Sequence, residues 1–315
     1  MLRTRAVSRT RVIVTLLVVQ AMFGTLPLTG QTVMRWIPPI GAASLRAVGA
    51  ALVFALVAGR QLATISLRDV PRLVLFTFLA IVGNQLLFLE GLSRTTQINA
   101  AVLITTIPVF TVAFALALRR ERASGLKLAG IAVGLAGALL LARIEQFTLA
   151  DREVVGDLLV IANCSLWSLY LVLARPVLQR IPPLVLTAWL FLLGALIVAP
   201  FGLPSVVDGM ADAPPEAWAA AGWMVVGPTI VAYLLNFQAL RDAESSHVAV
   251  FTYLQPVVAG VLAWFFADET LRPRTAVAAA LIFTGVALVQ WAAKRRAPID
   301  ATATPRTGDR RPDVG

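Results

Sequence analysis

The chain has 315 residues, of which 58% are hydrophobic and 14% are charged. Soluble domains average about 45 to 50% apolar and about 25% charged residues, so this composition excludes an ordinary soluble protein and indicates one that spans a membrane. The net charge of +10 does not indicate nucleic-acid binding, because no contiguous basic face on a folded domain accompanies it.

Ten apolar runs along the chain approach the roughly 20 residues that a helix needs to cross about 30 Å of hydrocarbon. The connecting segments are short and carry most of the charge, so we expect no inserted soluble domain. The predicted fold is therefore an all-α polytopic membrane protein with ten transmembrane helices. In chain order the predicted spans are 12–29, 39–59, 72–91, 97–118, 126–143, 155–174, 183–203, 217–240, 246–267 and 274–293.

The distribution of lysine and arginine orients these spans. With the N-terminus in the cytoplasm, 20 of these residues fall at the inner side and 6 at the outer side, while Arg46 lies within the second span. This asymmetry follows the positive-inside rule. We therefore predict a multi-pass protein of the cytoplasmic (inner) membrane with both termini in the cytoplasm.

The two ends of the chain differ from the spans. "MLRTRAVSRTR" and the apolar run behind it resemble a signal peptide, but the run is too long and no A-x-A site ends it. Residues 1–11 are therefore predicted to be a cytoplasmic segment before an uncleaved helix. The polar tail 294–315 contains proline and lacks apolar periodicity, which predicts cytoplasmic disorder. Cys164 is the only cysteine, which excludes an intrachain disulfide and a thiolate metal cluster.

The sequence repeats itself at a fixed offset. A shift of 148 residues aligns Pro108 with Pro256 and Glu121 with Glu269, and a shift of 144 aligns "IPP" at 37–39 with "IPP" at 181–183. The repeats are predicted to cover 12–143 and 155–293, joined by an outer linker, 144–154. Because five crossings is an odd number, the second repeat starts from the opposite face. Many secondary transporters have this inverted architecture, with substrate near the midplane between the halves.

With these motifs the chain resembles the EamA-type branch of the drug/metabolite transporter superfamily. The resemblance rests on "PVFTVAFALALRRERASGLKLAGIAVGLAGALLL", on "PVVAGVLAWFFADETLRPRTAVAAALIFTGVAL", and on Gly156-Asp157 followed by Trp167. The chain departs from the family pattern at Phe23-Gly24, where Trp-Gly is common, and at Ala278, which stands opposite Gly130. The resemblance implies export or exchange of small metabolites, amino acids or drugs. It also implies that spans 1, 3, 4, 6, 8 and 9 line a cavity.

Polar and aromatic side chains within the spans are the candidate substrate-binding residues. They are costly against lipid and should face the bundle or a water-filled cavity. Asn163, Trp167 and Tyr170 lie at i, i+4 and i+7, so they share one helix face. Interhelical hydrogen bonding is the alternative, worth about 0.6 kcal/mol on average. The candidates are Gln20, Asn84, Gln85, Asn99, Thr106, Asn163, Trp167, Tyr170, Tyr233, Asn236, Tyr253 and Gln255.

The repeated proline and glutamate carry separate predictions. Pro108 and Pro256 should each bend their span, either beside the cavity or as a packing kink. Glu121 and Glu269 end spans 4 and 9 at opposite faces. Helix C-termini disfavour negative charge, so each carboxylate should meet a cation from the arginines beside it. We interpret both glutamates as loop anchors, with a gate contact as the alternative.

Arg46 is the single cation inside an apolar run. A central arginine costs at least about 2.5 kcal/mol on insertion scales. We therefore expect Arg46 to snorkel outward or to pair with a structural partner. It is also the leading candidate for contact with an anionic substrate.

No nucleotide, zinc or hydrolase motif occurs, so we predict no cofactor, no metal and no enzymatic activity.

The predicted function is secondary transport by alternating access, as an exporter or exchanger of small metabolites, amino acids or amphipathic drugs. A counter-substrate or a proton is the expected coupling partner, and a proton would use the rim carboxylates Glu90 or Asp157. The GxxxG of Gly130 and Gly134 leaves a homodimer open. Alternatives are an intramembrane enzyme acting on lipid and a non-transporting membrane scaffold.

Overall fold

The computed structural model describes residues 9–121, 123–143, 148, 150–243, 245–267 and 269–294, and this part of the chain is helical without strands. The first repeat contains α1 (Arg9–Gly24), α2 (Leu26–Val33), α3 (Pro39–Ala58), η1 (Gly59–Thr64), η2 (Leu67–Asp69), α4 (Val70–Thr77), η3 (Phe78–Val82), α5 (Gly83–Leu92), α6 (Gln97–Ile104), α7 (Ile107–Ala117) and α8 (Gly125–Leu141). The second contains α9 (Arg152–Leu178), α10 (Pro183–Ala211), α11 (Pro215–Val225), η5 (Val226–Val231), α12 (Ala232–Asp242), α13 (Ser245–Val250), η6 (Phe251–Tyr253), α14 (Leu254–Phe266) and α15 (Pro273–Lys294).

Within these residues, nine helical segments are long and apolar enough to cross a membrane, and Gly125–Leu141 is a tenth, shorter apolar helix. The predicted all-α fold is confirmed. Parts of three predicted segments fall outside the described residues: 1–8 of the N-terminal segment, 144–147 and 149 of the linker, and 295–315 of the tail.

The seventh span is longer than predicted. We expected it to end at residue 203, near two prolines, but α10 continues through Pro200 and Pro204 to Ala211. Neighbouring helices and hydroxyl side chains can satisfy the backbone groups that proline leaves free in a membrane bundle. Hydroxyls contact the backbone of this helix here, since Ser44 Oγ of α3 donates to Val198 O at 2.8 Å and Ser205 Oγ donates to Gly202 O at 2.7 Å.

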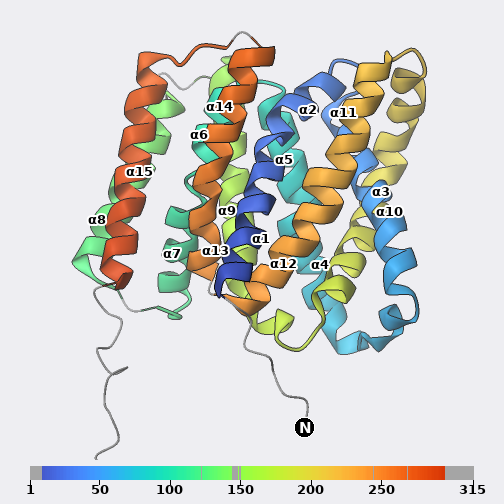
Figure 1. The fold of residues 1–315 in the computed structure, drawn as a ribbon, viewed down its shortest axis with the longest axis horizontal. Helices are drawn as coiled ribbons and strands as arrows, with labels where there is room; N and C mark the ends of the chain where they lie inside the picture. The colour runs from blue at the N-terminus through green and yellow to red at the C-terminus, as the bar shows by residue number, and fades with distance from the viewer. Residues whose placement is uncertain are drawn as a thin grey trace, which may run out of the picture.

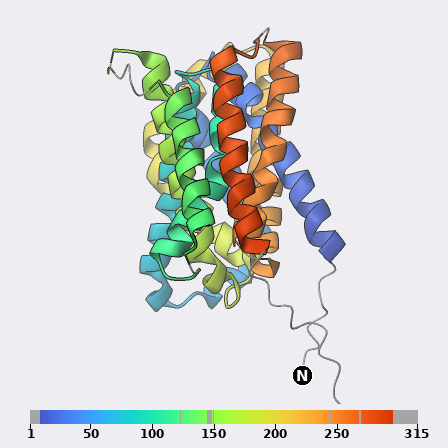
Figure 2. The same cartoon turned by 90° about the vertical axis from the view of Figure 1, so that its left-hand side faces the viewer.

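Two pairs of helices related by the repeat, α8 with α15 and α3 with α10, pack side by side and antiparallel (Figures 1 and 2). On α8, a Cβ added to Gly130 would lie 2.5 Å from Gly285 O, and one added to Gly137 would lie 2.9 Å from Ala278 O. The contacts thus move backward along α15 as they move forward along α8. Glycine is required at Gly130 because the two backbones approach this closely. The GxxxG of α8 is therefore occupied by contacts within the chain.

The equivalent pair α3 and α10 shows the same antiparallel order. A Cβ added to Gly41 of α3 would lie 2.6 Å from Ser205 Oγ, whereas Gly209, farther along α10, approaches Trp36, which precedes α3. Two repeats inserted in opposite directions require this geometry. The predicted inverted five-helix repeats are confirmed.

Both repeats interrupt their helices at matching places. In the fourth span, α6 ends at Ile104 and α7 begins at Ile107, one residue before Pro108. In the ninth span, the 3₁₀ turn η6 precedes α14, which contains Pro256. In addition, η3 and η5 are π-helical turns that begin 148 residues apart, in the third and eighth spans. The sequence did not predict these π turns, which occur frequently at functional sites.

Candidate functional site

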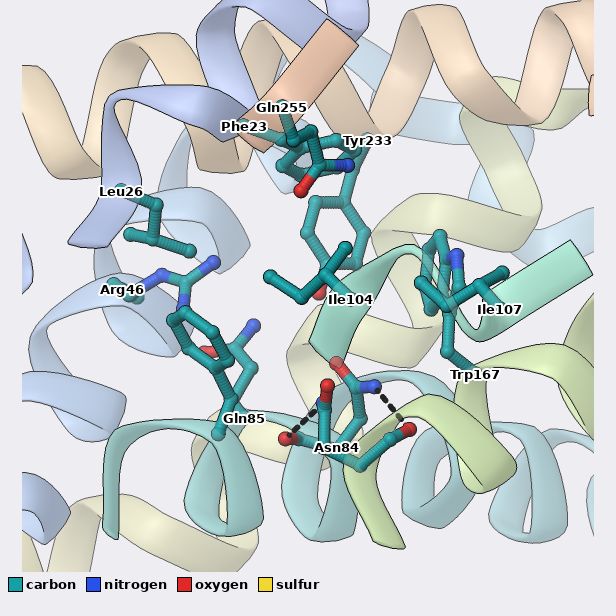
Figure 3. A pocket seen from close by; sticks show the side chains of 12 residues that line it. Phe23, Leu26, Arg46, Asn84, Gln85, Ile104, Ile107, Trp167, Tyr233 and Gln255 are labelled. Atoms are coloured by element: carbon teal, nitrogen blue, oxygen red, sulfur yellow. Dashed lines mark hydrogen bonds between the residues drawn. The ribbon is translucent and has the colours of Figure 1, made fainter. Parts of the chain in front are cut away.

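A small cavity lies between the two repeats, near the helix interruptions (Figure 3). Its volume is about 60 Å³, which is room for a few water molecules, since one requires about 10 to 15 Å³. Its walls come from spans 1, 2, 3, 4, 6, 8 and 9. The lining residues are Phe23, Leu26, Arg46, Asn84, Gln85, Phe88, Ile104, Ile107, Asn163, Trp167, Tyr233 and Gln255.

The cavity is built from equivalent positions of the two repeats. The offset of 144 relates Phe23 to Trp167, and the offset of 148 relates Gln85 to Tyr233 and Ile107 to Gln255. Both members of each pair line the cavity. A site with this composition lies where the two repeats face each other.

Three aromatic rings form one wall. The ring centroid of Trp167 lies 6.4 Å from that of Phe23 and 5.5 Å from that of Tyr233, and the Phe23 and Tyr233 centroids are 5.7 Å apart. All three contacts are edge-to-face, an arrangement that the ring quadrupoles favour. The Tyr233 hydroxyl donates to Ala80 O at 3.1 Å, so it is held by the π turn η3 of the other repeat. This wall offers a rigid apolar surface.

Amide side chains supply much of the polar part of the lining. Asn84 and Asn163 exchange hydrogen bonds: Asn163 Nδ2 donates to Asn84 O at 2.8 Å, and Asn84 Nδ2 donates to Asn163 O at 3.4 Å (dashed in Figure 3). Gln255 donates to the side chain of Gln20. The Nε2 and Oε1 atoms of Gln85, in contrast, are buried and make no hydrogen bond.

Arg46 lies in the same lining, and of the two expected alternatives the structure shows pairing inside the bundle and not snorkelling. Its side chain is 1% exposed, and its Nε donates to Thr229 Oγ1 at 2.9 Å. Thr229 belongs to the π turn η5 and donates in turn to Met224 O at 2.7 Å. The cavity and this hydroxyl offer the guanidinium a polar environment inside the bundle, so the arginine does not extend to the membrane surface.

Of the twelve predicted cavity residues, six line this cavity: Asn84, Gln85, Asn163, Trp167, Tyr233 and Gln255. The structure places the others outside the lining. Gln20 is bonded to Gln255, Tyr170 packs behind Trp167 with ring centroids 5.5 Å apart, and Asn236 is buried. Thr106 donates to Leu103 O at the interruption between α6 and α7, and the Tyr253 ring packs edge-to-face against Phe283. Asn99 lies at one end of the bundle, bonded to Glu153.

Sequence reasoning missed part of the site. Phe23 was noted only as a departure from the family pattern, and the apolar lining residues Leu26, Phe88, Ile104 and Ile107 carry no signal of their own. The repeat offset, applied to Trp167 and Gln255, would have found Phe23 and Ile107. Nothing in the sequence indicated that Thr229 would meet Arg46.

Polar contacts join the repeats at the end where α6 and α9 begin, called here the α6/α9 end (top of Figure 1). Glu269 accepts hydrogen bonds from Gln97 N at 2.9 Å and Ile98 N at 3.0 Å. The prediction that a neighbouring arginine would pair with it is wrong, because Arg272 instead bonds Glu153 at 2.8 Å. The positive N-terminus of α6 supplies the compensating charge.

Glu153, at the start of α9, is the centre of the second contact group. Its carboxylate accepts from Arg143 at 3.1 Å, Arg272 at 2.8 Å and Asn99 at 3.1 Å. Nearby, Asp157 Oδ1 accepts from the Thr95 hydroxyl at 2.5 Å, while Oδ2 is buried without a hydrogen bond. The contacts made by Arg143, Asn99 and Thr95 join the two repeats at this end.

At the opposite end, Glu121 forms an ion pair with Lys127 at 2.6 Å. We expected a neighbouring arginine as the cationic partner of Glu121, and the structure shows a lysine in this role. Arg120 donates to Val172 O at 3.2 Å and so joins the end of the fourth span to the sixth.

Pro108 and Pro256 each stand just beyond a helix interruption, and their role in conformational change stays a prediction.

A model of the EamA-like transporter family matches residues 10–143 and 154–291. An "Uncharacterized transporter" from Archaeoglobus fulgidus is 31% identical over 72% of this chain and 75% of its own length. A "Probable terminal-alkyne amino-acid exporter" from Streptantibioticus cattleyicolor is 27% identical over 70% of this chain and 73% of its own length.

A WAT1-related protein from Arabidopsis thaliana is 27% identical over 69% of this chain and 64% of its own length. A solved crystal structure matches with a TM-score of 0.65 and 24% identity, covering 91% of this chain and 99% of the matched one. At that identity the match shows a shared fold.

Proposed function

The chain belongs to the EamA-like transporter family, and we propose that it is a secondary transporter that binds its substrate in the cavity between the repeats. One observation carries the proposal: three pairs of repeat-equivalent positions line a single cavity. Rocking of oppositely oriented repeats around such a site exposes it to each side of the membrane in turn.

The lining favours small, partly apolar substrates. The aromatic wall would hold an apolar group, and the amides and Arg46 would hold a polar one. Small metabolites, amino acids and amphipathic drugs have this character. The relative named as an amino-acid exporter supports amino acids within that range and supports export or exchange as the direction.

The arginine and lysine distribution supports a cytoplasmic-membrane protein with both termini inside. In that orientation the α6/α9 end faces outward. Opening the cavity to the outside then requires the Glu269 contact with α6 and the Glu153 contacts to break. Opening it to the inside requires the contact between Arg120 and Val172 to break.

Two rim carboxylates were candidates for coupling to a proton. The Glu90 side chain is 38% exposed and pairs at 2.9 Å with Arg94, which lies just after the same helix. Asp157 is fully buried and one of its oxygens has no donor. A coupled proton would therefore bind at Asp157, and without one the protein exchanges substrate for a counter-substrate.

Flux measurements on purified protein in proteoliposomes test the proposal. We expect saturable flux that is stimulated by substrate on the opposite side. Trp167→Ala and Tyr233→Ala should each lower flux at least about tenfold, equivalent to about 1.4 kcal/mol, because each removes part of the aromatic wall. The flux of a radiolabelled panel of amino acids and amphipathic amines measures this effect.

Trp218→Ala is the matched control, because that side chain is 51% exposed on the outside of the bundle. Its flux should equal that of the unmodified protein. Unchanged flux in both Trp167→Ala and Tyr233→Ala, with the melting temperature preserved, would contradict the assignment of the site.

A further inference from the structure

We propose that Arg46 and Gln85 form a carboxylate-binding subsite, so that the transported compounds carry a carboxylate beside an apolar group. The inference rests on the proposed function, because it names the substrate class of the same cavity. Its basis is the set of hydrogen-bonding groups in the cavity lining that have no partner.

Arg46 is the charged group of the lining. It is buried, and its neighbours are the neutral hydroxyls of Thr229 and Tyr233. Among the residues that the structure describes, no aspartate or glutamate lies within ion-pair distance of it. A guanidinium has five N–H donors; the Nε–H group is engaged by Thr229, and the Tyr233 hydroxyl also lies within reach of the guanidinium. A buried cation without an anion is unfavourable, and a bound carboxylate would compensate it.

Gln85 is the second component of the subsite. Its side chain is 2% exposed, and neither of its amide atoms has a hydrogen-bond partner. Figure 3 places Gln85 and Arg46 on the same side of the cavity, with Trp167 on the other side. An unsatisfied buried amide in a native protein requires an explanation. A ligand that reaches both groups would provide it.

The other polar groups of the lining are already engaged. Asn84 and Asn163 bond each other's backbone, and Gln255 bonds Gln20. The free capacity is therefore concentrated at Arg46 and Gln85. Guanidinium N–H groups and the Gln85 Nε2 group are donors that suit a carboxylate. Gln85 Oε1 remains to accept from a donor on the substrate, such as the ammonium of an amino acid.

The aromatic wall determines the rest of the substrate. Trp167 lies across the cavity from Arg46 and Gln85, and Phe23 and the ring of Tyr233 continue the apolar wall (Figure 3). A compound with a carboxylate at one end and a short apolar or aromatic body at the other satisfies both sides. A purely cationic amphiphile would place its charge against Arg46, so it is disfavoured.

Matched ligands that differ only in the acid group test the subsite by binding. The full chain in detergent is titrated with 4-phenylbutyrate and with 4-phenylbutyramide at pH 7 and constant ionic strength, and thermal stabilisation is measured. L-phenylalanine and L-phenylalaninamide form a second pair. We expect each carboxylate to bind at least about tenfold tighter than its amide, as for a charge-assisted hydrogen bond.

Arg46→Gln should remove this preference while leaving the affinity for the amide unchanged, and Arg46→Lys should retain part of it. Arg60→Gln, at an exposed position that follows the same helix, should behave as the unmodified protein. If Arg46→Gln does not fold, Gln85→Leu provides the test, because it should weaken carboxylate binding and spare the amide. Equal affinity for acid and amide, a preference that persists in both variants, or no stabilisation by either acid would overturn the inference.

Flux separates this inference from the proposed function. Saturable transport of amides and amines at the same efficiency as acids would overturn the carboxylate subsite and leave the transporter intact. Acid-selective binding that depends on Arg46, without flux of any bound compound, would support the subsite and contradict transport.

Discussion

Replacing Glu269 with alanine should open the α6/α9 end of the protein about tenfold to a hundredfold more often. The carboxylate accepts two backbone hydrogen bonds, from Gln97 N and Ile98 N, at the positive end of α6. A hydrogen bond to a charged group contributes about 1.5 to 3 kcal/mol. Because Glu269 is partly exposed, we expect its two hydrogen bonds together to contribute about as much as one such bond. Because Glu269 and α6 belong to different repeats, the contact exists only while this end is closed.

A cysteine in the cavity reports this opening. Phe88→Cys is introduced in a Cys164→Ala background, and its labelling by a membrane-impermeant maleimide is followed from the α6/α9 side. Glu90→Ala is the matched control, because Glu90 pairs with Arg94, a residue of its own repeat. Equal labelling rates in Glu269→Ala, Glu90→Ala and the parent protein would show that the glutamate does not hold this end closed.

Replacing Glu121 with alanine should destabilise the protein by about 2 to 3 kcal/mol. The Lys127 side chain is 7% exposed, that of Glu121 is 27% exposed, and the two lie 2.6 Å apart. Removing one partner of a fully buried pair costs about 3 to 5 kcal/mol, whereas an exposed pair contributes about 0 to 1 kcal/mol. This pair is intermediate, and Glu121→Ala leaves the more buried charge without its partner.

Thermal unfolding in detergent checks the prediction through a double-mutant comparison. Lys127→Met should cost less than Glu121→Ala, because the carboxylate that remains is closer to water. The double variant should be more stable than Glu121→Ala alone, since it no longer buries an unpaired ammonium group. Asp242→Ala, which breaks an exposed pair with Arg241, serves as the control. A double variant less stable than Glu121→Ala would contradict this account of the pair.

The spans, the repeat and its inversion could be predicted because each follows from a pattern in the sequence. Apolar run length gives the helices, the offset of 148 gives the repeat, and the odd number of crossings gives the inversion. The same offset located the two prolines, and the structure interrupts the helix just before each of them. Helix ends were less predictable: α10 continues past Pro200 and Pro204, as a helix packed within a membrane bundle can.

The site was predictable in part. Polar residues that are costly against lipid had to face the bundle, which selected Asn84, Gln85, Asn163, Trp167, Tyr233 and Gln255 for the lining. The same rule also selected Tyr170, which packs behind Trp167. Helix periodicity shows which residues share a face, but it does not show which of them reach the cavity.

The partners of charged groups could not be predicted, because they come from distant segments. Arg46 meets Thr229 from the eighth span, and Glu269 meets the backbone of α6. The π turn that carries Thr229 has no recognised sequence signal here, so the sequence left both snorkelling and structural pairing of Arg46 open and did not identify its partner. In both cases the tertiary structure provides a closer partner than the one adjacent in sequence.

The central claim is that one cavity between the repeats faces each side of the membrane in turn. Labelling of Phe88→Cys, in the Cys164→Ala background and in sealed vesicles of known orientation, tests it most directly. The account predicts that the cysteine reacts with impermeant maleimide from either side. It also predicts that a bound probe such as 4-phenylbutyrate raises one of the two rates and lowers the other. Reactivity confined to one side under every condition, or two rates that always rise and fall together, would contradict it.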